Sequence, residues 1–121
     1  MSYLIIFCGA GLGGCLRYWI SSVSYKYLPV YFPYGTFAVN LLGSIILGLL
    51  IFGLDEKELL NNNLKIFLGI GFCGGLTTFS TFSLETFYLL IDAEFLLAGL
   101  NIIINVFITI AGIYFGYMIT R

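Results

Sequence analysis

Charged residues are scarce in this sequence. Only 9% of its 121 residues are charged and 60% are hydrophobic, whereas about 25% of the residues in a soluble domain are charged. A short soluble chain also has a large surface for its volume, so it needs more polar residues rather than fewer. The net charge of −1 supplies no basic field that would attract nucleic acid. These shortages indicate a chain that is surrounded by lipid and does not bind nucleic acid.

Histidine is absent, so the commonest metal ligand and the usual general base near neutral pH are both missing. The three cysteines, Cys8, Cys15 and Cys73, lie in apolar stretches and form no CxxC pair, which is typical of small buried hydrophobic residues. No Ser/His, Cys/His or metal-ligand set of side chains points to covalent catalysis. We therefore expect that the protein is not an enzyme.

Four apolar runs are each long enough to cross a membrane, which takes about 20 mostly apolar residues. They cover about residues 3–23, 34–54, 64–91 and 95–118. The first has no basic leader before it and no cleavage site after it, so we expect a retained helix rather than a signal peptide. None of the runs alternates in polarity as a barrel strand would. The sequence therefore predicts an all-α, multi-pass protein of the cell membrane, with one four-helix transmembrane domain over residues 1–121.

Glycine pairs at GxxxG spacing occur in the first and fourth runs. Gly9 and Gly13 form one pair, and Gly112 and Gly116 form the other. In lipid such faces let two helix backbones approach closely. Four helices of this size leave little room for a water-filled route, so we expect the chain to self-associate. The glycine pairs suit that association, and they suit packing within one chain as well.

Polar side chains recur at helical spacing in the second and fourth runs. The second carries Thr36, Asn40, Ser44 and Gly48 along one stripe, and the fourth carries Asn101, Asn105, Thr109 and Gly116. Polar groups at membrane depth are costly, so each stripe needs a partner. Hydrogen bonds between helices are one explanation. For Asn40 a second explanation stays open, since its amide has two donors that can face an anion.

Two ionisable residues lie inside apolar runs. Arg17 is in the first run, where a central arginine costs about 2.5–3.5 kcal/mol on insertion scales, so it must reach the interface or find a partner. Alternatively it lines an aqueous vestibule and attracts anions. Glu85, in the third run, can pair with Arg17, titrate, or face a water-filled vestibule.

The third run combines glycines with hydroxyl residues. Gly69, Gly71, Gly74 and Gly75 precede the stretch TTFSTFS at residues 77–83. Glycine lowers helix stability by about 1 kcal/mol per position relative to alanine, and serine and threonine offer the backbone competing hydrogen bonds. We therefore predict a break near residues 74–78, close to mid-membrane, where unwound backbone must be buried in protein or face a cavity. Freed carbonyls there could hold a cation, and freed N–H groups an anion.

Phe79 and Phe82 follow this break at i, i+3 spacing, on one face of the helix. Aromatic rings have a positive edge, along which a small anion could pass without meeting a full positive charge. Two core phenylalanines, among twelve in the chain, would show the same spacing. The residues alone predict a membrane bundle with a broken helix and a polar stripe, and they do not specify an ion.

Three motifs follow one another along the chain. They are GGCLRY at residues 13–18, GTFAVNLLG at residues 35–43 and GGLTTFSTFSLE at residues 74–85. Together they resemble the motifs of the CrcB/Fluc family of fluoride channels, and the chain length and the four segments agree with that family. The resemblance implies an antiparallel homodimer, inserted in both orientations, with two pores at its interface. It also implies passive export of fluoride from the cytoplasm.

The resemblance assigns expected roles to single residues. Asn40 matches a pore asparagine whose amide donates to fluoride, Phe79 and Phe82 match the pore phenylalanines, and Thr109 stands where relatives often carry a pore serine. A polar track along the third helix is implied for Ser80, Thr81, Ser83 and Glu85.

Further roles implied by the family concern a cation and a vestibule. The backbone carbonyls of Gly74 and Thr77 match the ligands of a structural sodium ion on the dimer axis, two from each chain. Arg17 matches the arginine of the vestibule. Asn101 replaces a tyrosine of some relatives, so the resemblance gives it no role.

A proton-coupled transporter, like the small multidrug-resistance proteins, is the alternative to a passive channel. Those proteins are also four-helix antiparallel dimers of similar length. They depend on a glutamate in the first helix, where this chain has Arg17 and no acid, so only Glu85 could serve. A purely structural membrane subunit would not explain the aligned polar groups. We therefore expect a channel whose partners are fluoride, the lipid bilayer and a second copy of the chain.

Overall fold

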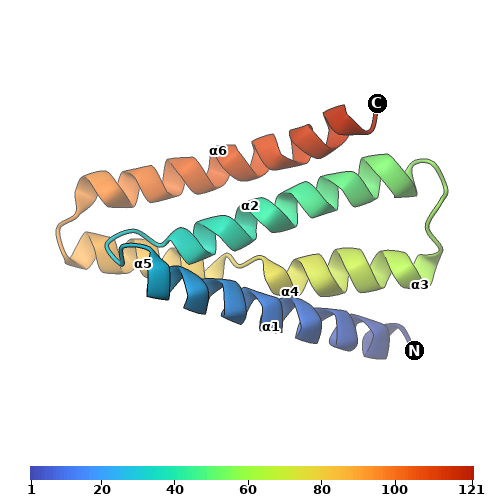
Figure 1. Cartoon of the computed structure of the whole chain (residues 1–121), viewed down its shortest axis with the longest axis horizontal. Coiled ribbons are helices and arrows are strands. Elements are labelled where there is room, and N and C mark those ends of the chain that lie inside the picture. Colours follow the sequence, from blue (N-terminus) through green and yellow to red (C-terminus); the bar gives the residue numbers. More distant parts are fainter.

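The computed structural model describes every residue from Met1 to Arg121, and it is helical throughout, without strands. Its elements, in order, are α1 (Ser2–Tyr27), α2 (Tyr34–Gly48), the π-helical η1 (Leu49–Asp55), α3 (Asn62–Lys65), the π-helical η2 (Ile66–Cys73), α4 (Gly74–Leu76), α5 (Ser80–Ile91) and α6 (Phe95–Ile119). They join into four segments that are long and apolar enough to cross a membrane, as predicted. Both termini and the loop before α3 lie at the same end of the bundle (Figure 1).

The largest difference from the predicted bounds is at the end of the first helix. We expected α1 to end at residue 23, and it continues to Tyr27. The next residue, Leu28, is extended, with φ −115° and ψ 155°. A proline disfavours helical backbone at the residue before it. Pro29, rather than the polar residues before it, therefore sets the end of the helix.

The glycine pairs are used for packing within the chain. Gly9 and Gly13 are buried, and a Cβ at either would collide with backbone carbonyl oxygens of η2. On the opposite side of the bundle, a Cβ at Gly116 would lie 2.8 Å from the carbonyl carbon of Gly48. The sequence left open whether the glycine pairs serve self-association or packing within one chain. In this structure they serve packing within one chain.

The third segment is interrupted between α4 and α5. Thr77 is extended, with φ −82° and ψ 161°, and α5 begins at Ser80. We expected the break to start at the glycines, and this is corrected, because Gly74 and Gly75 both lie in α4. A Cβ at Gly75 would collide with the backbone of Ala10 in α1, so this glycine serves a close helix contact. The chain leaves helical geometry at the first threonine instead.

The two halves of the third segment pack against different helices. α1 packs against η2 and α4, whereas α5 packs mainly against α6, which also runs along α2 (Figure 1). The interruption is therefore the point at which the third segment changes its partner helix.

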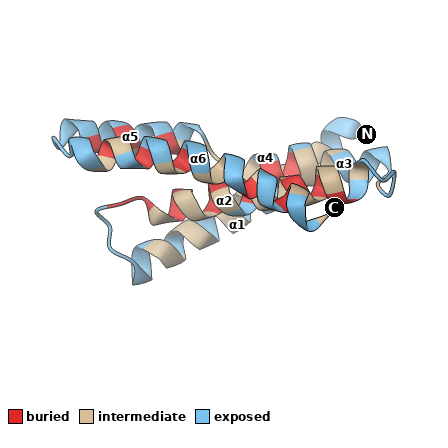
Figure 2. Ribbon diagram, turned by 90° about the horizontal axis from the view of Figure 1, so that it is seen from above, coloured by how far each residue is buried: buried red, intermediate tan, exposed pale blue.

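Burial is confined to the lines along which the helices touch (Figure 2). Only 24 of the 121 residues are buried, and large apolar side chains such as Phe7, Trp19 and Phe107 are exposed on the outer faces. An apolar surface of this extent suits lipid rather than water. Against this background, the buried Asn40, Asn101 and Asn105 are exceptional.

Candidate functional site

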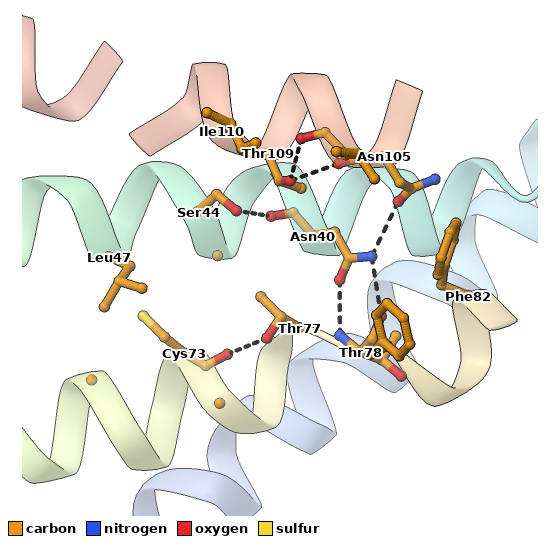
Figure 3. Close-up of a pocket in the computed structure, with 15 residues that line it drawn as sticks. Asn40, Ser44, Leu47, Cys73, Thr77, Thr78, Phe82, Asn105, Thr109 and Ile110 are labelled. Atoms are coloured by element: carbon orange, nitrogen blue, oxygen red, sulfur yellow. Dashed lines mark hydrogen bonds between the residues drawn. The ribbon is translucent and has the colours of Figure 1, made fainter. Parts of the chain in front are cut away.

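A groove of about 450 Å³ opens where the third segment is interrupted. It lies between α2, α6 and the residues on both sides of the interruption (Figure 3). The predicted site residues that line it are Asn40, Gly74, Thr77, Phe79, Phe82 and Thr109. The fold therefore brings together candidates that lie far apart in the sequence.

Asn40 is bound to the backbone of Thr78. The Thr78 N–H donates to Asn40 Oδ1 at 2.8 Å, and Asn40 Nδ2 donates to the Thr78 carbonyl at 3.2 Å (Figure 3). Where a helix is interrupted, its backbone groups lose their usual partners and need others. The buried Asn40 side chain supplies a partner for the N–H and for the carbonyl of this one residue.

The Asn40 amide is fully used within the chain. Its second hydrogen is donated to Asn105 Oδ1 at 3.1 Å. An anion that binds this amide must therefore replace one of two acceptors. The bond to Thr78 is only partly buried, whereas the bond to Asn105 is buried. Of the two Asn40 amide hydrogens, the one donated to the Thr78 carbonyl is thus the more accessible.

Two backbone carbonyls beside the interruption have lost their helical partners. In a continuous helix the Gly74 carbonyl would accept from the N–H of Thr78, which instead donates to Asn40. The Thr77 carbonyl would accept from the N–H of Thr81, which instead donates to the Thr78 hydroxyl at 3.1 Å. No backbone N–H elsewhere donates to either carbonyl. Both oxygens are therefore free.

Gly74 and Thr77 are the residues of the groove that could hold a cation. Both line it, and a hard cation prefers oxygen ligands such as carbonyls of unwound helix. A Cβ at position 74 would meet nothing within 4 Å, so the chain leaves open space on that side of the residue. The free oxygens fit the sodium ion that the motif resemblance implies, and one chain supplies only part of a coordination shell.

Phe79 and Phe82 lie side by side at the groove. Their ring centroids are 5.5 Å apart, with the ring planes inclined by 53°. Phe82 is buried, whereas Phe79 is 78% exposed. A large ring so exposed needs a further neighbour, which is lipid or another protein chain.

The hydroxyl residues of the predicted polar track lie outside the groove. Ser80 and Ser83 are exposed and Thr81 is half-buried. The Ser80 hydroxyl lies 3.5 Å from that of Thr78, at the edge of the interruption. Their part in conduction stays a prediction.

Arg17 and Glu85 do not pair with each other. Arg17 Nε donates to the Gly75 carbonyl at 3.1 Å, so it caps the last turn before the interruption. Glu85 Oε2 accepts from the Tyr25 hydroxyl at 3.2 Å, and Glu85 Oε1 is buried without a partner. Glu85 borders a separate cavity of about 320 Å³. The predicted vestibule role of Arg17 is a prediction still, and its observed contact is with the backbone.

Sequence reasoning did not name Thr78, Asn101 or Asn105 as site residues. The Thr78 hydroxyl accepts from the N–H of Thr81, near the start of α5. Such local bonds from a threonine to the backbone three residues on are common where a helix begins. Asn101 and Asn105 stand one helical turn apart, which places both on one face of α6. That spacing was visible, but the partners of the two amides were not.

Comparison with known proteins identifies the family. The family model described as CrcB-like protein, Camphor Resistance (CrcB), matches residues 4–117. The chain is 48% identical to the fluoride-specific ion channel FluC of Pyrococcus abyssi, over 98% of this chain and 94% of that protein. It is 41% identical to the fluoride-specific ion channel FluC of Coxiella burnetii, over 100% of this chain and 98% of that protein.

These matches confirm the resemblance that the three motifs indicated. They extend over nearly the whole chain, so they include all four membrane segments. The chain is therefore a multi-pass membrane protein, and it belongs to the CrcB/FluC fluoride-channel family.

Proposed function

We propose that the protein is a passive, fluoride-selective channel through which fluoride leaves the cytoplasm. The observation that carries this proposal is the groove in which the buried amide of Asn40 and the rings of Phe79 and Phe82 meet beside an interrupted helix. Amide hydrogens and ring edges both carry partial positive charge. The relatives from Pyrococcus abyssi and Coxiella burnetii are named fluoride-specific ion channels, which supports the same ion here.

Selectivity follows from the strength of the donors. Fluoride is small and strongly hydrated, so a filter must replace its water shell with suitable donors. No lysine or arginine lines the groove. An anion there meets partial charges that can replace water, and no positively charged side chain that would hold it in place.

A second copy of the chain completes the pathway in this proposal. The groove is open on one side, and the exposed Phe79 ring at its edge has no cover within one chain. Two chains related by a two-fold axis in the membrane plane would place one groove on each side of their interface, giving two pores. The antiparallel arrangement is consistent with a weak charge bias, because Lys57, Lys65 and Arg121 stand at one end and Lys26 at the other.

A structural sodium ion at the interface is part of the same proposal. The free carbonyls of Gly74 and Thr77 would hold it, and a second chain would contribute the same two oxygens. When bound, the ion would join the two chains and would favour anions nearby through its positive charge.

Proton coupling is not needed for this function. Glu85, the one acid deep in a helix, borders a different cavity and accepts a hydrogen bond from Tyr25. Fluoride movement should therefore follow the fluoride gradient and the voltage alone. Uphill fluoride movement driven by an imposed proton gradient would instead favour a transporter.

Fluoride efflux from liposomes that contain the purified protein tests the proposal. We expect fast fluoride efflux, with chloride efflux close to that of protein-free vesicles. Equal permeation of the two ions, or no fluoride efflux from vesicles that hold correctly folded protein, would contradict it.

A further inference from the structure

A chain of buried hydrogen bonds connects α2, α6 and α5. Asn40 Nδ2 donates to Asn105 Oδ1 at 3.1 Å, and Asn105 Nδ2 donates to Asn101 Oδ1 at 2.8 Å. Asn101 Nδ2 then donates to Thr86 Oγ1 at 2.9 Å, and the Thr86 hydroxyl donates to the Phe82 carbonyl at 2.8 Å. All the donors point the same way, from the Asn40 amide towards the backbone that carries a groove phenylalanine.

Backbone groups fix the orientation of the amides. The N–H of Thr78 can only donate, so Asn40 must turn its oxygen towards it. The carbonyl of Asn101 can only accept, so Asn105 must turn its NH₂ group towards it, at 2.9 Å. With both ends set in this way, the NH₂ group of Asn40 and the oxygen of Asn105 face each other.

Burial makes this chain of bonds rigid. Asn101 is 0% exposed and Asn105 is 5% exposed, so water does not replace a partner that is lost. Loss of a hydrogen-bond partner lowers the stability of the protein far more when the remaining polar group is buried than when it lies at the surface. Aligned hydrogen bonds also strengthen one another in an apolar surrounding. The Asn40 amide is therefore held by a network that extends well beyond its own helix.

We propose that Asn105 is a positioning residue of the ion pathway. It accepts a hydrogen bond from one amide hydrogen of Asn40. The other amide hydrogen, which is donated to the Thr78 carbonyl in this structure, is then the one presented to fluoride. The bond to Thr78 is the one that is only partly buried. The inference rests on the proposed function and adds to it the residue that orients the donor.

Two substitutions separate this role from simple packing. Asn105→Leu has a similar size and makes no hydrogen bond. Asn105→Asp depends on pH: the neutral acid can accept from Asn40 and donate to one of the two Asn101 oxygens to which asparagine donates. The ionised acid places negative charge against the Asn101 oxygens and beside the anion route. A residue that only fills space would not respond to pH in this way.

The experiment is fluoride efflux from liposomes between about pH 5 and pH 9. Protein-free vesicles are measured at each pH, because HF crosses lipid. At the acid end we expect Asn105→Asp to conduct within about threefold of the natural protein, and Asn105→Leu to fall about tenfold or more below it. We expect Asn105→Asp to lose flux as the pH rises and to recover it when the same vesicles are returned to acid.

Two outcomes would overturn the proposal. One is an Asn105→Leu variant that conducts like the natural protein. The other is an Asn105→Asp variant that is equally impaired at every pH, since its neutral form restores the bond from Asn40 and one bond to Asn101. Failure of the proposed function itself is recognised separately, because the natural protein would then carry no fluoride in these vesicles.

Discussion

The Asn40 side chain and the Thr78 backbone exchange two hydrogen bonds, of 2.8 and 3.2 Å. These two bonds join the amide side chain of α2 to the backbone of the interrupted segment in the groove. It fixes an amide donor beside the rings, and it removes the N–H that would otherwise occupy the Gly74 carbonyl. In the proposed function, this one contact therefore serves both the anion site and the cation site.

Replacing Asn40 with aspartate should abolish conduction. In Asn40→Asp one oxygen still accepts from Thr78 N–H, but the other faces the Thr78 carbonyl and Asn105 Oδ1, which are both acceptors. The fixed negative charge also repels anions. We expect fluoride efflux to fall by about a hundredfold or more, measured in liposomes with protein whose dimer fraction matches that of the natural chain. Unchanged flux would remove Asn40 from the pathway.

Removing the Thr78 hydroxyl should weaken the proposed cation site. In Thr78→Val the N–H of Thr81 loses its acceptor and is free to return to the Thr77 carbonyl. We expect the sodium concentration that half-maximally stabilises the dimer in detergent to rise about tenfold. The readout is the dimer fraction at increasing sodium and constant ionic strength.

Thr120→Val is the matched control for that experiment. The Thr120 hydroxyl donates only to carbonyls of its own helix, Gly116 and Tyr117, at the far end of α6. The same substitution of valine for threonine at this position should not change the sodium concentration that half-maximally stabilises the dimer. Equal behaviour of the two variants would show that the Thr78 hydroxyl does not affect the cation.

Close packing of α1 should make Gly13 sensitive and Gly11 tolerant. A Cβ at Gly13 would collide with the Phe72 carbonyl, whereas a Cβ at Gly11 meets nothing within 4 Å. We expect Gly13→Ala to lower the free energy of unfolding by about 2 kcal/mol or more, and Gly11→Ala to change it little or raise it. Denaturant titration of the folded protein in detergent measures both. Two variants of equal stability would contradict this packing.

Dual insertion can be tested with one cysteine. In a variant whose Cys8, Cys15 and Cys73 are replaced, Lys57→Cys places a thiol in the loop between the second and third segments. A membrane-impermeant reagent should label about half of the molecules in intact cells, because the charge difference between the two ends is small. Complete labelling or complete protection, in a variant that still conducts, would show one fixed orientation and defeat the antiparallel arrangement.

The four spans could be predicted because the thickness of a bilayer fixes the length of an apolar helix. The position of the interruption could be predicted only approximately. Local propensity placed its start at the glycines, but Gly75 is held in helix by its contact with Ala10. A contact between two helices overrode the preference of the isolated segment.

The candidate site could also be predicted only in part from the sequence. Asn40 and Phe82 could be chosen from motifs and from the cost of polar groups in lipid. Their partners could not, since Asn40 meets Thr78 across 38 residues of sequence and Asn105 across 65. Neither spacing nor composition specifies contacts of that range, which follow only from the way α2 packs against α6 and against the third segment.

Because the third segment changes its partner helix at the interruption, its two halves are open to separate modification. Substitutions on the inner face of α1 act on the turn that carries the free Gly74 carbonyl. Substitutions on the inner face of α6 act on the helix that carries Phe82. In the proposed dimer, related sequences could therefore tune the strength of dimer closure and the width of the proposed anion route independently, each through a different helix.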